Sequence, residues 1–204
     1  MKQTLLIIWL ALTACAASAD SVSYVDARLE NANGNALGVD TVTRALNTID
    51  YAHHEIHDAS HYALKGWVDI TSSATNTFLI VVPDTAKNPH VLYTFNAEAE
   101  MTLTVYENPT VSATGAVMTA YNNDRNSTNT PGVTFWSTPV YTGGTNIWAA
   151  KVGSGKKIGG GVRGDSEYIL RRNAKYTFNV LNNSEQTKWF DYEFLWYEHT
   201  SKTD

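Results

Sequence analysis

Apolar and polar residues alternate along several short segments in the second half of the chain. In residues 101–105 the apolar side chains alternate strictly with threonines, and residues 176–180 and 190–196 repeat this period of two. Each of these segments therefore has one apolar face and one polar face, as antiparallel strands do when one side is buried and the other meets solvent. We predict solvent-backed strands over all three.

A second kind of segment is apolar throughout. Residues 78–82 are continuously hydrophobic and are followed by Pro83 and Asp84, which predicts a central strand that is covered on both faces. Beyond Tyr62, no window of 11 or more residues has a convincing helical period. Further strand candidates, separated by turn-forming residues, are 62–70, 91–96, 110–121, 133–141, 146–152 and 167–171. Nine or ten short strands at this spacing predict an all-β fold, an antiparallel β-sandwich or jelly roll.

The first 19 residues form a signal-like apolar segment. Lys2 precedes an apolar run at residues 5–12 that is too short to span a bilayer as a helix, and Ala17-Ser18-Ala19 has the small residues of a cleavage site. Residues 12–15 also fit a lipoprotein signal, in which Cys15 would carry the lipid and attach the chain to a membrane. The alternative is an assembly arm that is retained and packs against a partner.

The domain boundaries follow from the change in patterning. Residues 20–47 are polar and broken by Gly and Asn, which predicts an extended arm with at most two helical turns near its end. We place the β-sandwich domain at residues 48–204. Within it, residues 153–161 hold five glycines and are predicted to be a mobile loop. Their Gly-Lys step does not make a phosphate loop, because Ala150 stands where a glycine is needed and Lys157 where a Ser or Thr is needed.

Charge and cysteine content exclude several function classes. The formal charge is -5 and the sequence pI is about 5.6, so the basic footprint of a nucleic-acid-binding protein is missing. The single cysteine allows neither an internal disulfide nor a thiolate metal cluster. The chain also lacks a nucleophile elbow, and Glu98 and Glu100 are better explained as a hydrophilic strand face than as a glycosidase pair. We expect no catalytic residues and no cofactor.

Histidines are concentrated between residues 53 and 61, which hold four of the six in the chain. In a helix, the four-residue step from His53 to His57 would place two imidazoles on one face; in a strand, His53, Glu55 and His57 would share a face. Either arrangement makes His53 and His57 the candidates for a metal site, but we expect none and predict a structural contact. The candidate interface residues are His53, His54, Glu55, His57 and His61.

Tryptophans provide a second candidate surface. Trp136, Trp148, Trp189 and Trp196 are able to form a platform on which sugars stack, since aromatic rings present broad apolar faces. Most aromatic side chains in a β-sandwich belong instead to the core or to an interface, and we give that interpretation precedence.

Five segments resemble a family of tailed-bacteriophage virion structural proteins, in the same order along the chain. The first runs from Ala45 through the histidines to Tyr62 and includes the sequence HHEIHDASHY. The others contain an apolar strand with a Pro-Asp-Thr turn, a strand-turn-strand step, an Asn-rich loop and a C-terminal aromatic strand; they lie at residues 79–85, 104–111, 121–127 and 194–200. Together with the Gly-Ser-Gly loop, the resemblance covers residues 45–200.

The resemblance implies a non-enzymatic β protein on the virion, of the capsid decoration or head-surface type, whose partners are the major capsid protein or other virion proteins. It brings no catalytic residues. The signal-like N-terminus departs from the family, because virion proteins assemble in the cytoplasm and need no export. The alternative is therefore an exported bacterial surface protein or lipoprotein that binds a glycan or a protein, and is secreted or held in the outer membrane.

The aromatic content also bears on assembly. Aromatic residues make up 11% of the chain and charged residues only 17%, which would leave apolar strand faces exposed on a monomer. We therefore expect a homo-oligomer, with a trimer favoured.

Overall fold

The computed structural model describes residues 51–153, 160–163 and 167–200. The predictions for segments 1–19 and 20–47, and for Cys15, lie outside the described residues, as do those for 154–159 within the Gly-rich stretch. The chain divides after Thr48, and all described elements belong to the unit Ile49–Asp204. In the described part of the chain, no helix is long and apolar enough to cross a membrane.

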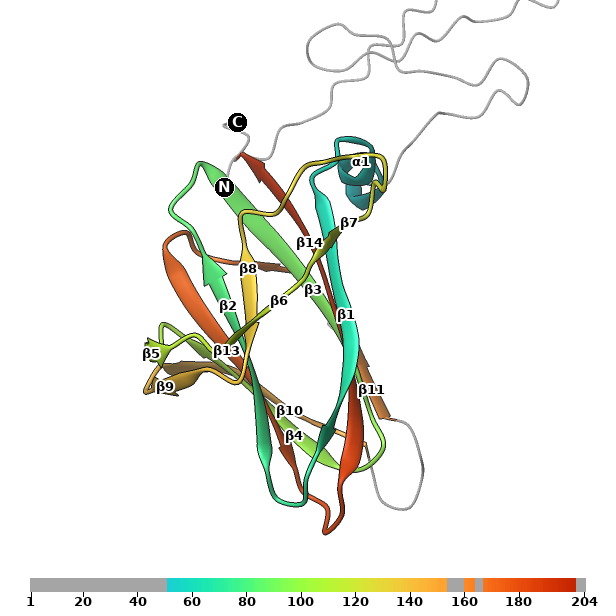
Figure 1. The fold of residues 1–204 in the computed structure, drawn as a ribbon, viewed down its shortest axis with the longest axis vertical. Helices are drawn as coiled ribbons and strands as arrows, with labels where there is room; N and C mark the ends of the chain where they lie inside the picture. The colour runs from blue at the N-terminus through green and yellow to red at the C-terminus, as the bar shows by residue number, and fades with distance from the viewer. Residues whose placement is uncertain (1–50, 154–159, 164–166, 201–204) are drawn as a thin grey trace, which may run out of the picture. The chain divides into compact units, whose positions relative to one another are not determined.

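Two six-stranded antiparallel sheets make up most of this unit (Figure 1). The first sheet has the order β11-β3-β14-β1-β7, and β12 also pairs with β3. Its strands are β1 (His61–Ile70), β3 (Lys87–Ala97), β7 (Tyr121–Asn122), β11 (Gly160–Arg163), β12 (Tyr168–Ile169) and β14 (Lys188–Thr200).

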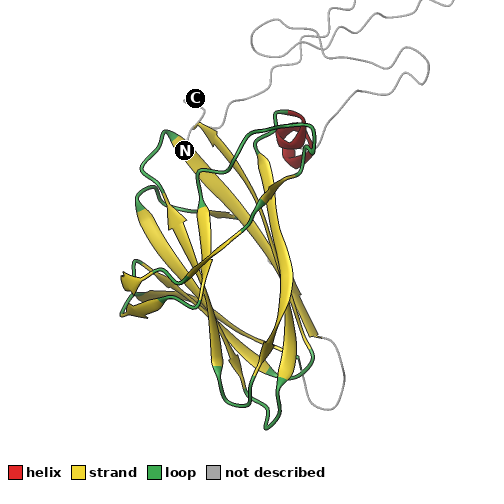
Figure 2. Cartoon of the chain, viewed as in Figure 1, coloured by secondary structure: helices red, strands yellow, loops and turns green. Residues whose placement is uncertain are grey.

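The second sheet has the order β10-β4-β13-β2-β8-β6. Its strands are β2 (Thr75–Val82), β4 (Met101–Glu107), β6 (Ala116–Met118), β8 (Thr134–Ser137), β10 (Thr145–Val152) and β13 (Ala174–Asn182). A separate two-stranded ladder joins β5 (Thr110–Ala113) to β9 (Val140–Thr142). The one described helix, α1 (Tyr51–His57), lies at one end of the sandwich, just before β1 (Figure 2).

Aromatic side chains fill the space between the two sheets. Phe194 on β14 lies at their centre, with its ring centroid 5.1 Å from that of Phe135 and 5.2 Å from that of Phe178. Tilted and edge-on contacts of this kind add to the free energy gained by burying the rings. Alternate residues of β3 and β4 are buried, as the period of two requires when one face of a strand meets the core.

The predicted all-β sandwich is confirmed, and so is the central strand at residues 78–82. Phe78, Leu79 and Ile80 on β2 are all buried, and β2 lies between β13 and β8.

Two of the predicted strands were too long. The segment 110–121 is broken into β5, β6 and β7. The first break falls at Gly115, which has a φ of +85° and where a Cβ would collide with the backbone oxygen of Ser137. The segment 133–141 is likewise divided, at Thr138, whose φ is 54°. The alternation of apolar and polar residues does not show where the backbone turns, so these breaks could not be predicted from it.

The predicted loop at 153–161 was also wrong in part. Gly160 and Gly161 belong to β11, where they pair with Ala97 and Asn96 of β3. A glycine keeps its backbone N–H and C=O, so ladder hydrogen bonds to a neighbouring strand can hold it despite its weak preference for strands.

Candidate functional site

The outward face of the first sheet carries two different groups of side chains. Antiparallel pairing places His61 of β1 opposite Tyr197 of β14. Eight residues further along β1, it places Asp69 opposite Trp189. We call the region around His61 and Tyr197 the histidine end, and the region around Asp69 and Trp189 the tryptophan end.

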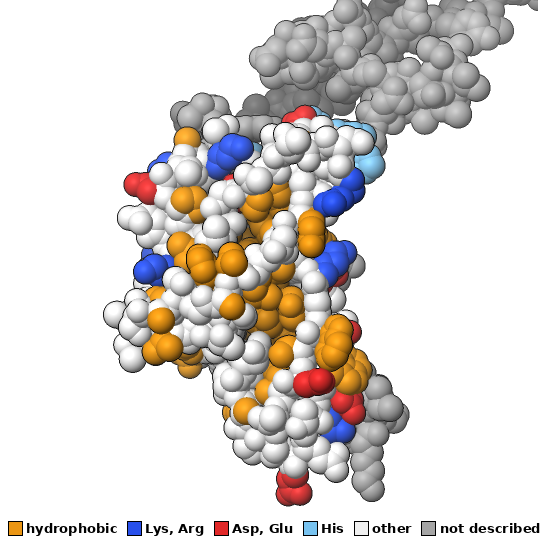
Figure 3. Space-filling view, in the orientation of Figure 1, with side chains coloured by type: hydrophobic (Ala, Val, Ile, Leu, Met, Phe, Trp, Pro, Cys, Tyr) orange, Lys and Arg blue, Asp and Glu red, His pale blue; other side chains and the backbone are white. Residues whose placement is uncertain are grey.

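All six histidines of the chain gather at the histidine end, which is also the α1 end of the sandwich. Figure 3 shows histidine surface, in pale blue, at this end. His53, His54 and His57 come from α1, and His61 begins β1. The other two come from strands that are distant in sequence: Tyr197 of β14 pairs with His90 of β3, and His199 lies two residues further along β14. The sheet register thus brings the predicted histidine segment together with two histidines that are distant from it in sequence and were not predicted to join it.

Three of these imidazoles surround the ring of Tyr197. The Tyr197 ring stacks on His90, with centroids 4.7 Å apart, and on His199 and His61 at 5.8 and 6.3 Å. Its hydroxyl donates to Oε1 of Glu167, at 2.5 Å. Tyr197 is itself buried, so these stacked rings form a packed cluster on the outer face of the sheet.

Glu167, which immediately precedes β12, orients His90. Its Oε1 forms a short hydrogen bond to Nδ1 of His90, whose side chain is only 13% exposed. His199 is oriented in the same sense by a backbone carbonyl, because its Nδ1 lies 2.7 Å from the oxygen of Thr200. The two Nε2 atoms then face each other at 2.8 Å.

His61 is buried, with only 5% of its surface exposed. Burial lowers the pKa of its imidazole, because the charged form loses more hydration than the neutral form; nearby Lys65 also lowers it, and Glu55 opposes the shift. The side-chain amide of Asn123 donates to Nδ1 of His61 at 2.7 Å, a contact that an imidazolium could not accept.

Helix α1 ends in a turn that fixes the predicted histidine segment. Ala59 has a φ of 53°, and the amides of Ala59 and Ser60 donate to the carbonyls of Ile56 and Glu55, both at 3.0 Å. This pattern is a Schellman motif, which turns the chain from the helix into β1. Glu55 is buried and accepts a short hydrogen bond from the Ser60 hydroxyl.

The helical alternative for His53 and His57 is the one that the structure adopts. Their Nε2 atoms lie 3.0 Å apart on the exposed side of α1. The ligand atoms of His54 and Glu55 on the same helix and of Asp58, which follows its last residue, lie within 4.8 Å of one another. Of the five predicted interface residues, His53, His54 and His57 are exposed, whereas Glu55 and His61 are buried within the chain.

The segment that begins at the edge strand β7 and leads to β8 is bonded to this end of the sheet. The side-chain amide of Asn122 donates to the Ala59 carbonyl at 2.9 Å. The carboxylate of Glu198, only 6% exposed, accepts from the backbone amides of Gly132 and Val133, both at 3.0 Å, and from the indole N–H of Trp196 at 3.1 Å. Glu198 therefore ties the loop to the end of β14.

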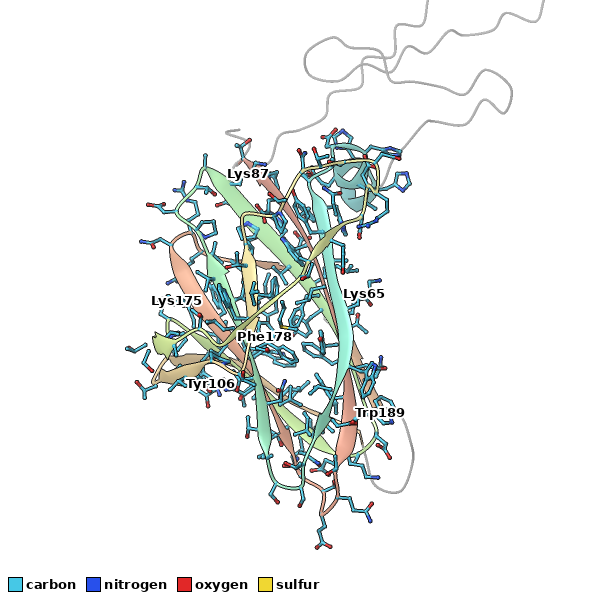
Figure 4. All side chains as sticks on the ribbon, in the orientation of Figure 1. Lys65, Lys87, Tyr106, Lys175, Phe178 and Trp189 are labelled. Carbon is cyan, nitrogen blue, oxygen red and sulfur yellow. The ribbon has the colours of Figure 1, made fainter. Side chains whose placement is uncertain are left out.

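The tryptophan end is open by comparison. Trp67 and Asp69 of β1 face Asp191 and Trp189 of β14, so that each tryptophan lies opposite an aspartate. These four side chains line a depression of about 430 Å³, and Trp67 is 66% exposed. In Figure 4, Trp189 lies on the outer side of this strand pair, far from Phe178 in the core.

The other three candidate tryptophans do not form the platform that the sequence allowed. Trp196 is fully buried in the core, and Trp148 packs edge-on against Tyr93 with centroids 5.3 Å apart. Trp136 donates its indole N–H to the hydroxyl of Thr134. Of the four candidates, Trp189 alone shares the outward surface with Trp67. Trp67 was not among the candidates, and the register of β1 with β14 brings it beside Trp189 and the two aspartates.

Comparisons with protein-family models, with curated proteins and with solved structures gave no match for this chain.

Proposed function

We propose that this chain is a non-enzymatic structural protein of a tailed-bacteriophage virion, which decorates or stabilises the capsid surface. The observation that supports the proposal best is where the resembling segments lie. Three of them, at residues 45–62, 121–127 and 194–200, are far apart in sequence, and their described residues, which begin at Tyr51, meet at the histidine end.

Backbone hydrogen bonds join these three segments directly. The amide of Glu198 donates to the carbonyl of Ser60 at 3.1 Å, and the amide of Asn123 donates to the carbonyl of His61 at 2.9 Å. The Asn122 side chain adds its bond to Ala59. Resembling segments that are bonded to one another in the fold support a shared fold and role better than the same number of segments that do not touch.

The segment before the sandwich is proposed to attach it to the particle. Residues 20–47 have few evenly spaced apolar positions and gain stability by docking on a partner such as the major capsid protein.

We also propose that the protein is a homo-oligomer, with a trimer favoured. Large apolar side chains are exposed on several strands of the described unit: Trp67, Val117, Tyr121, Val140 and Ile169 are each more than half exposed. Contacts between copies or with the capsid would remove this surface from water. A clean monomer both by light scattering in solution and on purified particles would contradict the oligomer.

Particle binding tests the proposed division between arm and domain. Particles that lack the protein are mixed with the full chain or with a chain that begins at Thr48, and bound protein is measured after sedimentation. The full chain should bind in a saturable manner, while the shorter chain should melt cooperatively but stay in the supernatant. If the full chain does not bind, the virion proposal is wrong; equal binding of both chains would place attachment in the sandwich.

The tryptophan end favours a second candidate function, that of an exported bacterial surface protein or lipoprotein that binds a glycan. Aromatic faces stack on the apolar faces of sugar rings, and carboxylates accept hydrogen bonds from hydroxyls. Trp67, Trp189, Asp69 and Asp191 provide both on one open surface.

The native N-terminus distinguishes the two candidates most cheaply. Mass spectrometry should find an intact Met1 if the segment is an assembly arm. A mature chain that starts at Asp20, or at a lipidated Cys15, would show export and favour the second candidate.

A further inference from the structure

The strand β1 is fully paired on one side only. On that side it pairs with β14 from His61 to Ile70, whereas on the other side β7 pairs with Tyr62 and Ala63 alone. The stretch 64–70 is therefore an open edge of the first sheet in the described part of the chain, and we call it the β1 edge.

The backbone groups of three residues point out of the β1 edge. The carbonyl of His61 accepts from the amide of Asn123, next to β7, so it points away from β14. Because successive residues of a strand direct their backbone groups to opposite sides, the other odd-numbered residues do the same. The N–H and C=O groups of Lys65, Trp67 and Asp69 have no hydrogen-bond partner among the described residues. Such a row of unpaired groups is a template for another strand.

The other long open edge among the described strands is less suited to pairing. The strand β10 pairs only with β4, and the register of this ladder shifts between Asn146 and Trp148. A bulge of this kind bends the strand and is a common protection of a sheet edge. The ladder of β1 with β14 runs from His61 to Ile70 without a shift, so the β1 edge is regular.

Apolar side chains are partly exposed beside the β1 edge. Val68 of β1, Met118 of β6 and Tyr192 of β14 pack against the core but are only half-buried, and Val117 of β6 is 65% exposed. Figure 3 shows apolar side chains gathered on this face, between β1 and the second sheet. A partner that continues the first sheet at this edge would withdraw apolar surface from water as well as satisfy the backbone.

We propose that the β1 edge pairs with the β1 edge of a second copy of the chain, antiparallel, with the two Trp67 residues opposite each other. This register is centred on the open stretch, so residues 64–70 of the two copies cover each other and stop where β7 begins. The unpaired N–H and C=O groups of the odd-numbered residues in each copy then bond to those of the other.

Charge complementarity favours this register. With Trp67 at the centre, Lys65 of each copy lies opposite Asp69 of the other, and opposite charges directly across two strands stabilise their pairing. Asp69 has no ion pair within the described residues, and the Lys65 side chain is 61% exposed although it pairs with Glu193. Registers that place Lys65 opposite Lys65, or Asp69 opposite Asp69, would bring like charges together.

Dimerisation through the β1 edge does not depend on the virion proposal, because it is a property of the isolated chain. It specifies the symmetry of the oligomer. A two-fold contact produces a dimer or a multiple of a dimer, whereas the trimer favoured above has no two-fold axis. The mass of the protein in solution therefore distinguishes the two.

Sedimentation equilibrium of the full chain at several concentrations measures the association, and circular dichroism checks that each variant is folded. We expect a reversible dimer for the wild type. Asp69→Lys should weaken it by about tenfold, because two symmetric pairs then have like charges. Adding Lys65→Asp should restore the dimer by exchanging the two charges. The matched control is Asp84→Lys, which makes the same charge change in an exposed turn between β2 and β3 and should leave the dimer unchanged.

Disulfide formation tests the register directly, in chains that also carry Cys15→Ser. Trp67→Cys places two thiols opposite each other, at a Cα separation of about 5.5 Å that suits a disulfide. In Asp69→Cys the two thiols are four residues out of register, about 13 Å apart along the strands, and should not link. Lys65→Cys alone should not link either, but an equal mixture of Lys65→Cys and Asp69→Cys chains should.

Several results would overturn the proposal. These are a wild-type monomer at every concentration, a trimer, an Asp69→Lys dimer as tight as that of the wild type, equal weakening by Asp84→Lys, no rescue by the exchanged charges, or disulfides that do not follow the expected pattern. A wild-type dimer that does not bind particles would leave this contact standing and contradict the virion proposal alone.

Discussion

The histidine end and the tryptophan end of the first sheet are built on the same pair of strands, yet they differ in burial and in hydrogen bonding. At the histidine end, His61 and Tyr197 are buried, and the helix, the Asn-rich loop and Glu198 are joined by hydrogen bonds. At the tryptophan end, Trp67 stands open to solvent. The strands β1 and β14 provide the same backbone at both ends, so the difference comes from what covers them.

This difference separates stability from recognition. Buried polar groups are costly unless each has a partner, so the histidine end should tolerate little change. Exposed side chains contribute little to folding and are free to bind a ligand. Substitutions at the two ends should therefore have opposite consequences.

The largest expected effect is that of Glu198→Ala. It removes three hydrogen bonds to a buried carboxylate and leaves two backbone amides and the Trp196 indole without that partner, so we expect a loss of about 3–5 kcal/mol in the free energy of unfolding.

The control is Glu193→Ala on the same strand, where an exposed pair with Lys65 is lost at a cost of about 0–1 kcal/mol. Urea denaturation measures both. Similar losses in the two variants would mean that the histidine end is not held by Glu198.

A smaller effect is expected on lowering the pH. The pKa of His61 is lowered in the folded state, so below the unfolded-state value of about 6.5 the unfolded chain takes up a proton that the folded chain resists. The stabilisation is complete above that pH and is lost progressively as the pH falls below it.

The comparison is with His61→Asn, which keeps an acceptor for Asn123 and cannot be protonated in this range. Melting temperatures from pH 7.5 to 5 should fall more steeply for the wild type than for this variant. The charges that act on His61, Glu55 and Lys65, are unchanged in both proteins. Parallel curves would show that burial of His61 has no part in the acid sensitivity.

The smallest effect on stability is expected from Trp67→Ala at the open end, within about 0.5 kcal/mol. Its consequence should be seen in binding instead. If a saccharide quenches the tryptophan fluorescence of the wild type, the variant should lose that response while its unfolding curve is unchanged. A large loss of stability would show that Trp67 is covered in the native assembly, and would favour an interface over a sugar site.

The sequence was sufficient for the fold class because alternation and apolar runs depend on local residue order. Residues 101–105 and 78–82 became β4 and β2 with the predicted burial. It was insufficient for the site, because His90 and His199 meet only through the β3–β14 register, and Trp67 and Trp189 only through the β1–β14 register. Register depends on the hydrogen bonds between strands that are distant in sequence, which a single sequence does not display.

The virion proposal is tested most directly by counting the native protein on purified particles. Particles banded in a density gradient are washed in high salt, and the protein is quantified by mass spectrometry relative to the major capsid protein. The proposal predicts a constant, stoichiometric ratio between preparations that survives the wash. Traces that vary between preparations, or recovery of the protein in the membrane or secreted fraction instead, would contradict it.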